Sequence, residues 1–560
     1  LCYSELATRF PLGGSAYVYT YATTGEFCAF VIGWSMVLEY TLGAALAAKT
    51  WSQYVDVVTN GSLSRAMNDW IGVLSVPGFD TSPDIPAVLV ILIVTVGVVG
   101  KVKLGCIINN ALVFINLLVI TGVILVGMFN MDAENWITGA GFFQFGLGGL
   151  ITGATLCFYA FIGYDIIATS TGEMEHRSKV LPGSVSLTFL IGLVASFITA
   201  ASITLVVPSS LLEKRGPLLQ AFDIRKIHGM KFFVIIGANC GLLSSTGACL
   251  FALSRVQHSL ANDGLLFSFL SRYNNNTGTS WWASLTSSLL SAIVAVFCDS
   301  TGLLNMLGMG TLVAYSSVAV SVLCLRYGAS ERLPLELGEL SRESTLTLPL
   351  GGTSNTYLSQ VNSSTQTHGL NSTKEDGPVA QTPSSTPINE AWETVNACTP
   401  STDQIGETAI MVGTVQRDYG AVQPRTMSVE FVNENYVSSL SDLTSLGYQK
   451  QEPNRKSVTT SAAMVATIFS LAAIMGLLTM HAPLLGHENR WWLEVVVCVM
   501  FVAVITCVGV LLRQPRHRPR IRNGVACIPF LPICAIWICV HLMTCLSYTA
   551  WVTFLVWDLI

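Results

Sequence analysis

An ionisable residue, Asp165, lies inside an apolar stretch that is long enough to cross a membrane. Residues 149–171 read GLITGATLCFYAFIGYDIIATST, with glycines in the middle of the run. A carboxylate exposed to lipid near mid-bilayer costs several kcal/mol, so such groups face a bundle interior and mark a path for substrate or ions. Unpaired backbone at that depth is tolerated only beside protein or a water-filled cavity. The stretch therefore predicts a broken membrane helix that lines a polar cavity.

A simpler interpretation of the same stretch is a kinked helix in which Asp165 points inward near one end. Glycine is common in membrane helices. This span alone therefore leaves both interpretations open.

The composition identifies the class of protein. Of the 560 residues, 51% are hydrophobic and 11% are charged, whereas about 25% of the residues in an ordinary soluble domain are charged. The net charge of -5 is spread through loops and indicates no nucleic-acid partner. Runs of roughly twenty apolar residues predict about twelve membrane spans, which makes the lipid bilayer a partner. The predicted spans centre near Met36, Val94, Leu118, Tyr159, Leu193, Gly241, Leu290, Val313, Ala472, Val502, Cys534 and Phe554.

Cysteine and histidine usage gives no sign of a cofactor. The 15 cysteines lie mostly inside apolar spans without the spacing of paired metal ligands, so we expect structural packing and no metal site. The sequence contains no G-x-S-x-G, P-loop or H-E-x-x-H motif, and its 8 histidines are scattered. We therefore do not expect an enzyme.

Lysine and arginine gather on alternate connections between the spans, which predicts their cytosolic side. Residues 513–522 form the richest of these connections. Residues 208–231 are read as external despite their positive charges. On this orientation the Asn60-Gly61-Ser62 sequon is external and a candidate for N-glycosylation. The other sequons, which would be cytosolic and silent, are at Asn275, Asn362 and Asn371.

A long polar segment divides the chain. Residues 328–459 are rich in Ser, Thr, Pro, Gly and Asn and poor in aromatic residues, which is typical of a disordered loop. We expect this loop to be cytosolic and to separate a core at 1–327 from four transmembrane helices at 460–560, the last of them truncated. The loop is either an inert linker or a binding region for a cytosolic partner.

Four segments resemble the cationic amino acid transporter family of the amino acid, polyamine and organocation superfamily. They are GSAYVYTYATTGEFCAFVIGW at 14–34, CFYAFIGYDIIATSTGE at 157–173, SRVQHSLANDGLLFSFL at 254–270 and GMGTLVAYSSVAVSVLCLRY at 308–327. Their order and spacing are similar to those of the family. The long loop before the last four spans is most similar to the divergent, poorly characterised branch.

This resemblance implies an all-α polytopic membrane protein with an inverted-repeat core. Five plus five helices form that core, the first and sixth helices are unwound around one central site, and four extra helices follow. In this register the chain starts at the end of the second helix. We therefore expect it to be a fragment that lacks the first helix.

The resemblance also implies a site for an amino acid. Amide groups at a helix break suit the substrate carboxylate, and carbonyl groups suit its ammonium. Ser244 and Ser245 of the eighth helix are further candidates, although hydrogen bonding between helices explains them equally well. The substrate-binding residues implied at the break are Tyr159, Ala160, Phe161, Ile162, Gly163, Tyr164 and Asp165.

Three glutamates are candidates for a role in transport. Glu26 matches a family glutamate that is important for transport, but an acid at a helix start also complements the helix dipole by about 0.3–1 kcal/mol. Glu39 lies deeper in the same span, where charge is expensive, so we expect an inward-facing carboxyl that is paired or protonated. Glu173 lies near the implied cytosolic gate, where this chain reads TGEM and the family reads TGEE.

The leading hypothesis is a secondary transporter of amino acids, with cationic ones as candidates, that works by alternating access. Asn116 replaces a lysine that stands in for sodium in related proteins, which favours exchange or uniport. The alternative is a transport-silent amino acid sensor or scaffold, because ALSR at 252–255 replaces the family's PMPR. A channel is less favoured because no filter segment is present. The expected location is the plasma membrane or an endolysosomal membrane.

Overall fold

In the part of the chain that the computed structural model describes, all the regular elements are helices. Within it the only β-type pairing is an isolated bridge between Asn274 and Thr279. The prediction of an all-α fold is confirmed for these residues. The structure describes all residues except 11, 72–82, 101, 138–148, 151–152, 155–156, 158–160, 162, 164, 172–176, 209–210, 213–216, 275–278, 329–453, 482–490, 517–524, 526 and 560.

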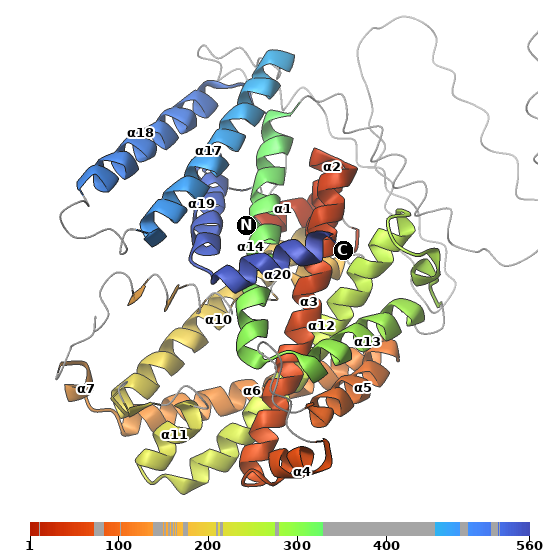
Figure 1. The fold of residues 1–560 in the computed structure, drawn as a ribbon, viewed down its shortest axis with the longest axis vertical. Helices are drawn as coiled ribbons and strands as arrows, with labels where there is room; N and C mark the ends of the chain where they lie inside the picture. Colours follow the sequence, from red (N-terminus) through yellow and green to blue (C-terminus); the bar gives the residue numbers. More distant parts are fainter. Residues whose placement is uncertain are drawn as a thin grey trace, which may run out of the picture. The chain divides into compact units, whose positions relative to one another are not determined.

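The helices follow one another in the order shown in Figure 1. They are α1 (Cys2–Arg9), α2 (Ala16–Thr24), α3 (Glu26–Val58), α4 (Ser62–Ile71), α5 (Ile85–Val99), α6 (Val102–Phe129), α7 (Glu134–Ile137), α9 (Ile166–Thr169), α10 (Arg177–Val206), α11 (Pro217–Ile224), α12 (His228–Asn262), η4 (Ser268–Ser271), α13 (Trp281–Phe297), α14 (Ser300–Tyr327), α17 (Arg455–His481), α18 (Trp491–Arg513), α19 (Phe530–Thr544) and α20 (Tyr548–Leu559).

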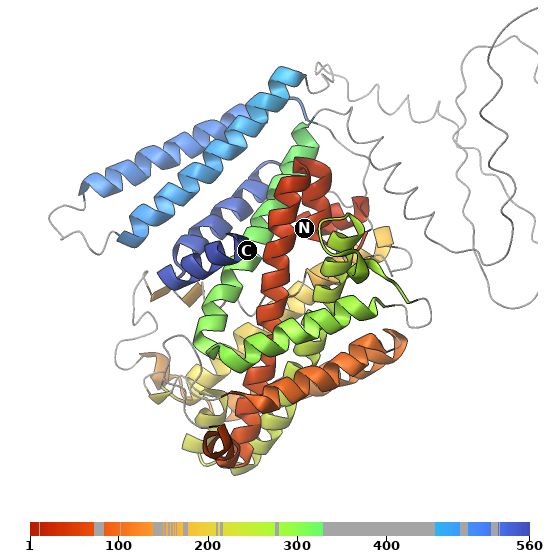
Figure 2. The same cartoon turned by 45° about the vertical axis from the view of Figure 1, so that its right-hand side comes forward.

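Helices α3 and α14 form the centre of this arrangement. In the most apolar window of α3, 78% of the residues are buried, and the value for α14 is 72%. Helix α3 packs most extensively against α12 and α14, and Figure 2 shows the red α3 beside the green α14. Helix α2 lies against α3 after a sharp turn at Gly25, where φ is +107°. Any polar group on the inner faces of α3 and α14 is therefore shielded from lipid.

Small residues allow these central helices to approach closely. A Cβ atom added at Gly310 of α14 would lie 3.1 Å from the Ser35 carbonyl oxygen and 3.2 Å from Glu39 Cβ. A Cβ atom added at Gly43 of α3 would lie 3.0 Å from Cys249 Sγ on α12. Membrane helices associate through such packing because lipid gives them no hydrophobic drive to pair.

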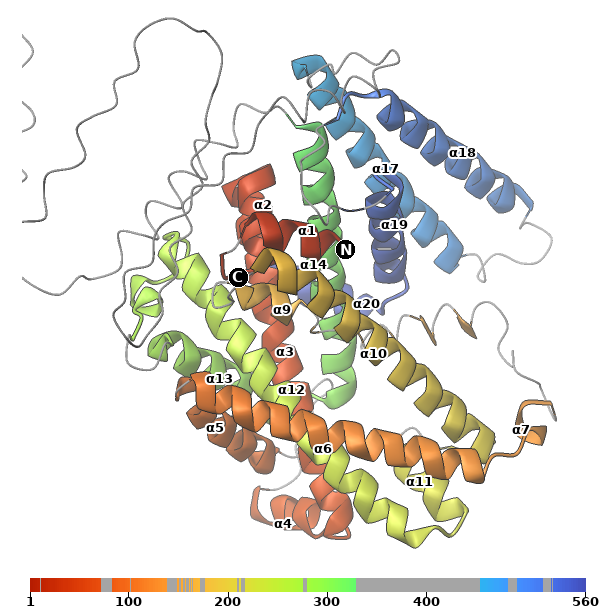
Figure 3. The same ribbon diagram turned by 180° about the vertical axis from the view of Figure 1, so that it is seen from behind.

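Helices α6 and α10 present apolar side chains outward. Only 17% of the most apolar window of α6 and 11% of that of α10 are buried. Phe114 on α6 is 68% exposed and Phe197 on α10 is 71% exposed. Figure 3 shows both helices on the near side of the view from behind. An apolar surface this extensive needs hydrocarbon rather than water around it. The described part holds 7 helices long and apolar enough to cross a membrane, so the protein is polytopic.

Four of the predicted spans form short helices. Helices α5 and α13 have 15 and 17 residues, and α19 and α20 have 15 and 12. At 1.5 Å per residue such helices reach about 18–26 Å, whereas the hydrocarbon core is about 30 Å thick. Helices α19 and α20 meet at an angle of 108° and together pass as one broken span or re-entrant loop. Four C-terminal helices are present, but they do not give four separate full-length crossings.

The structure describes only part of the predicted division of the chain. Residues 329–453 lie outside the described part, so the loop predicted at 328–459 stays a prediction. So does any cytosolic partner of that loop. Helix α17 begins at Arg455, before the predicted boundary at 460.

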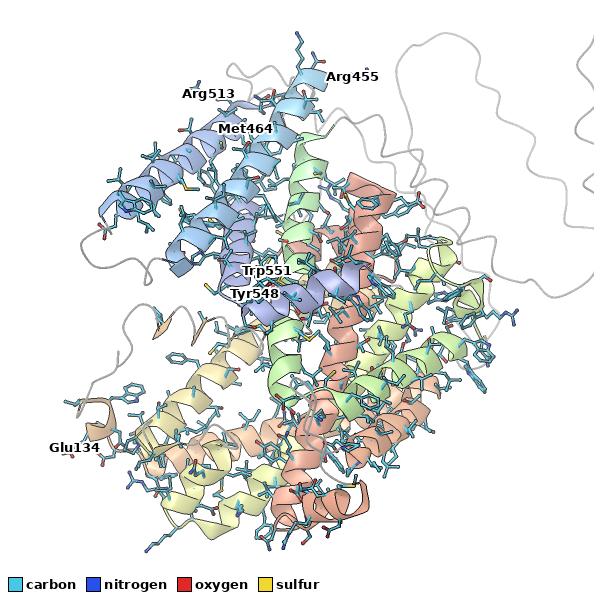
Figure 4. All side chains as sticks on the ribbon, in the orientation of Figure 1. Glu134, Arg455, Met464, Arg513, Tyr548 and Trp551 are labelled. Atoms are coloured by element: carbon cyan, nitrogen blue, oxygen red, sulfur yellow. The ribbon has the colours of Figure 1, made fainter. Side chains whose placement is uncertain are left out.

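One end of the membrane helices carries Arg455 and Arg513, whereas α11, which is followed by the exposed Arg225 and Lys226, lies at the other end. Figure 4 shows Arg455 and Arg513 together at the upper end and Glu134 at the lower end. Helix α4 also lies at the lower end in Figure 1. The predicted cytosolic side is the one that carries the basic connection at 513–522, which begins at Arg513, so the upper end corresponds to the predicted cytosolic side. The structure is thus compatible with the predicted orientation.

A buried ion-pair cluster joins three distant segments at one end of α14. The Glu5 carboxylate of α1 is fully buried and lies 2.7 Å from both Arg9 Nη2 and Arg326 Nη2. It also accepts a hydrogen bond of 2.7 Å from the Val525 amide, ahead of α19. One carboxylate thereby ties α1 and α14 to the segment that leads into the last two helices.

The substitution Glu5→Ala should strongly destabilise the protein. Removing one member of a buried ion pair leaves uncompensated charge and costs about 3–5 kcal/mol. The matched control is Asp223→Ala, because the Asp223–Lys231 pair spans 3.2 Å and is at least one-third exposed. Such a pair is worth at most about 1 kcal/mol. Thermal unfolding in detergent measures both variants, and equal stability losses would contradict the importance of this cluster.

Candidate functional site

The Asp165 carboxylate is held by two tyrosines from the two central helices. Asp165 is fully buried, with 0% of its surface exposed. Tyr40 of α3 donates a short hydrogen bond to Asp165 Oδ2, and Tyr315 of α14 donates one of 3.4 Å to Oδ1. Asp165 directly precedes α9, and its carbonyl oxygen accepts the Ala168 amide at 2.8 Å. The expectation that this carboxylate turns away from lipid agrees with its burial.

A second carboxylate, Glu39, is buried beside the first. Glu39 is also 0% exposed. Its Oε1 accepts a hydrogen bond of 2.7 Å from Thr311 Oγ1 of α14, whereas its Oε2 has no hydrogen-bond partner within the described part of the chain. The two carboxylates are close enough for their charges to interact. Among the described residues neither forms a salt bridge. Within the described part of the chain, hydroxyl and backbone amide groups therefore donate to the two acidic groups, but no cation pairs with them.

The backbone at Gly163 leaves the helical conformation. Its φ of +105° lies in a region that right-handed helices do not use and that glycine adopts without a Cβ penalty. Helix α9 begins only at Ile166, whose amide donates to the Gly163 carbonyl oxygen at 3.1 Å. This local departure is compatible with an interrupted span.

Several predicted site residues cannot be placed. Five of them lie outside the described residues, so their roles stay predictions: Tyr159, Ala160, Ile162, Tyr164 and Glu173. Phe161 is described and half-buried, and its ring centroid lies 5.6 Å from that of Phe189 on α10. Phe161 therefore contacts α10.

The remaining predicted residues lie apart from the two buried carboxylates. Ser244 of α12 donates a hydrogen bond of 2.6 Å to Asn109 Oδ1 of α6, which matches the helix-pairing interpretation. Ser245 is exposed. Glu26 is exposed in the first turn of α3, where an acid complements the helix dipole. None of these contacts Asp165 or Glu39 through a described hydrogen bond.

Aromatic rings surround the carboxylates. Tyr3 of α1 makes edge-on contacts with Tyr19 of α2 and with Tyr315, at centroid distances of 6.2 and 5.5 Å. Tyr19 is fully buried, and its hydroxyl has no hydrogen-bond partner among the described residues. The negative faces of aromatic rings attract cations. Carboxylates among tyrosines thus form an interior that favours a positively charged group.

Sequence reasoning missed the groups that hold the two carboxylates. These are Tyr40, Tyr315 and Thr311, from α3 and α14. Tyr40 directly follows Glu39 in an apolar span, and this position could have marked it as a candidate partner for a buried carboxylate. Nothing in the spacing of Tyr315 or Thr311 indicated which carboxylate each would meet, because the pairing depends on how α14 docks against α3.

The substitution Tyr40→Phe should destabilise the protein more than Tyr315→Phe does. Losing Tyr40 leaves a buried carboxylate oxygen without its donor, which costs about 1–3 kcal/mol. The Tyr315 bond is longer, at 3.4 Å, so its loss should cost less than about 1 kcal/mol. Thermal unfolding in detergent compares these matched variants. An equal or larger effect of Tyr315→Phe would mean that Tyr40 is not the principal partner of Asp165.

Comparison with known proteins identifies the family. The family model for amino acid permeases matches residues 1–340. Cationic amino acid transporter 4 from Mus musculus is 33% identical over 328 residues, which is 58% of this chain and 52% of that protein. Its Homo sapiens namesake is 33% identical over 331 residues, or 59% and 52%. A mitochondrial cationic amino acid transporter 3 from Arabidopsis thaliana is 30% identical over 329 residues, or 58% and 54%.

The chain spans about half the length of the curated relatives it matches. The matched region contains both central helices and both buried carboxylates. The resemblance to cationic amino acid transporters is confirmed, and the chain belongs to the amino acid permease family.

Proposed function

We propose that this protein moves amino acids across a membrane by alternating access around the Asp165–Glu39 pair. The observation that carries the proposal is the burial of two carboxylates, both 0% exposed, between the central helices. Membership of the permease family supports amino acids as the substrate class. Intramembrane carboxylates usually mark a substrate or ion path.

The chemistry of the pair suits a positively charged group of the substrate. Two like charges that interact in a medium of low dielectric raise each other's energy. A hydroxyl such as Tyr40 or Thr311 stabilises a carboxylate by donating a hydrogen bond but does not neutralise it. An ammonium or guanidinium group would add the missing positive charge, and the buried tyrosine rings support such a cation. The ligand is therefore the α-ammonium of an amino acid or a cationic side chain.

Burial of the pair is also the reason to propose alternating access. A group with no solvent exposure is reached from water only when the packed helices around it move. Asp165 is held simultaneously by α3 and α14 through tyrosine hydroxyls. Separation of these helices, or movement of the Gly163–Asp165 segment, would open the site to one side at a time.

Removing either carboxyl charge should reduce transport with little effect on folding. Glu39→Gln and Asp165→Asn keep the side-chain volume, so the fold should be preserved. Because each removes a carboxyl charge, we expect uptake by proteoliposomes to fall at least about tenfold, which corresponds to 1.4 kcal/mol of lost interaction. The control is Asp69→Asn on α4, because Asp69 is exposed. Radiolabelled uptake is measured over a panel of cationic and neutral amino acids. Substrate binding without flux in the unsubstituted chain would contradict transport and favour an amino acid sensor.

Asn116 supports uniport or exchange rather than coupling to sodium or protons. It lies on α6 against α12, where a Cβ atom added at Gly241 would be 2.9 Å from Asn116 Nδ2. An uncharged amide at this helix interface supplies no ionic group that could replace a coupling ion. The driving force is then the substrate gradient together with the membrane potential.

Membrane potential alone should drive accumulation of a cationic amino acid. A singly charged solute gains about 2.3 kcal/mol per 100 mV, or roughly fifty-fold accumulation. The measurement is uptake of labelled arginine or lysine under a potassium diffusion potential, without sodium or proton gradients. A neutral amino acid is the matched control and should not accumulate. Uptake that requires a sodium or proton gradient would overturn uniport.

The remaining parts of the proposal concern place and partners. We retain the plasma membrane or an endolysosomal membrane as the site of action, with the lipid bilayer and a small amino acid as partners. Imaging of the tagged chain beside markers of both membranes distinguishes them. The core at 1–327, the loop at 328–459 and the helices at 460–560 remain the proposed functional division.

A further inference from the structure

The connection between α3 and α4 carries a modification signal that the proposed function does not use. Residues Asn60-Gly61-Ser62 form an N-x-Ser sequon. Asn60 and Gly61 both have positive φ values, +50° and +74°, so the chain reverses sharply here. Both Asn60 and Ser62 are exposed. The sequon is therefore displayed at the tip of a turn.

Surrounding hydrogen bonds fix this turn while leaving the asparagine side chain free. Asp56 accepts the Ser64 amide at 3.0 Å and the Ser64 hydroxyl at 2.5 Å, which joins the end of α3 to α4. Arg65 donates to the backbone carbonyl oxygens of Gly61 and Asn60 at 3.0 and 2.8 Å. Asn60 Nδ2 donates no hydrogen bond to another described residue. The nucleophilic atom of the sequon is thus exposed and unengaged.

The turn lies at the end of the helices opposite Arg455 and Arg513. Helix α3 has 33 residues, whereas about twenty suffice to cross a bilayer, so its last turns project from the hydrocarbon. Figure 1 places α4 at the lower end of the helices, and Figure 4 places Arg455 and Arg513 at the upper end. On the orientation predicted from the basic connection at 513–522, the α3–α4 turn faces the outside or an organelle lumen.

We propose that Asn60 is an N-glycosylation site. In the transfer, Asn60 Nδ2 attacks the anomeric carbon of an oligosaccharide linked to a lipid pyrophosphate. The new carbon–nitrogen bond forms as the carbon–oxygen bond to the pyrophosphate breaks. The lipid pyrophosphate leaves with the electron pair, and the amide nitrogen gives up one proton. The proposal rests on orientation and exposure, and it is independent of transport activity.

Expression of the whole chain in mammalian cells tests the site. We expect one discrete loss of apparent mass on treatment with peptide N-glycosidase, and no such loss in Asn60→Gln or Ser62→Ala. Ser62→Thr keeps the sequon and should keep the glycan. Ser64→Ala removes the hydroxyl hydrogen bond to Asp56 but keeps the backbone one and does not touch the sequon, so it should also remain glycosylated. Persistence of the mass loss in Asn60→Gln would assign the glycan to another sequon and overturn the proposal.

A second variant tests the orientation separately. Asp132→Thr creates a sequon at Asn130, an exposed residue between α6 and α7, and Figure 1 shows α7 at the same lower end as α4. Combined with Asn60→Gln, it should restore one glycan. If Asn130 is modified and native Asn60 is not, the site assignment is wrong. If neither is modified, the orientation on which it rests is wrong, and the proposal falls for that reason.

Discussion

The fixed constraint in this protein is that the fully buried Asp165 carboxylate must find hydrogen-bond donors in the interior of a membrane protein. An isolated ionised carboxylate there is expensive. Tyr40 and Tyr315 supply hydroxyl donors from α3 and α14, so the two central helices must stay in register with the segment before α9. The arrangement of these elements follows from that requirement.

The packing of the central helices serves the same constraint. Gly310 brings α14 within van der Waals contact of α3 beside Glu39, and Gly43 brings α3 against α12. A larger side chain at Gly310 would push α14 away, and Thr311 would then move from the Glu39 carboxylate that it contacts at 2.7 Å. The close packing at Gly310 thus keeps Thr311 within hydrogen-bond distance of the buried Glu39 carboxylate. Lipid-facing helices such as α6 carry no equivalent demand and tolerate a wide choice of apolar residues.

Stability and ligand affinity compete at this site. Hydroxyl donors stabilise the two carboxylates, yet within the described part of the chain Glu39 Oε2 and the Tyr19 hydroxyl have no hydrogen-bond partner. An interior with unmet polar groups has more to gain from a ligand than a fully satisfied one. The buried cluster of Glu5, Arg9 and Arg326 is different, because charges of both signs are already paired there. That difference separates a candidate binding site from a structural junction.

Much of this could be predicted from the sequence, because apolar runs and buried charge obey local rules. The lengths of α3, α6, α10, α12 and α14, the inward-turned carboxyls of Asp165 and Glu39 and the non-helical backbone at Gly163 all have signals within one span. Hydropathy did not indicate that α19 and α20 meet at 108°, because the angle between two helices is a tertiary feature. The partners Tyr315 and Thr311 lie far along the chain from the acids they meet, so only helix docking decided them. Hydropathy determines which segments leave water, whereas side-chain pairing depends on rotation and depth that no single helix specifies.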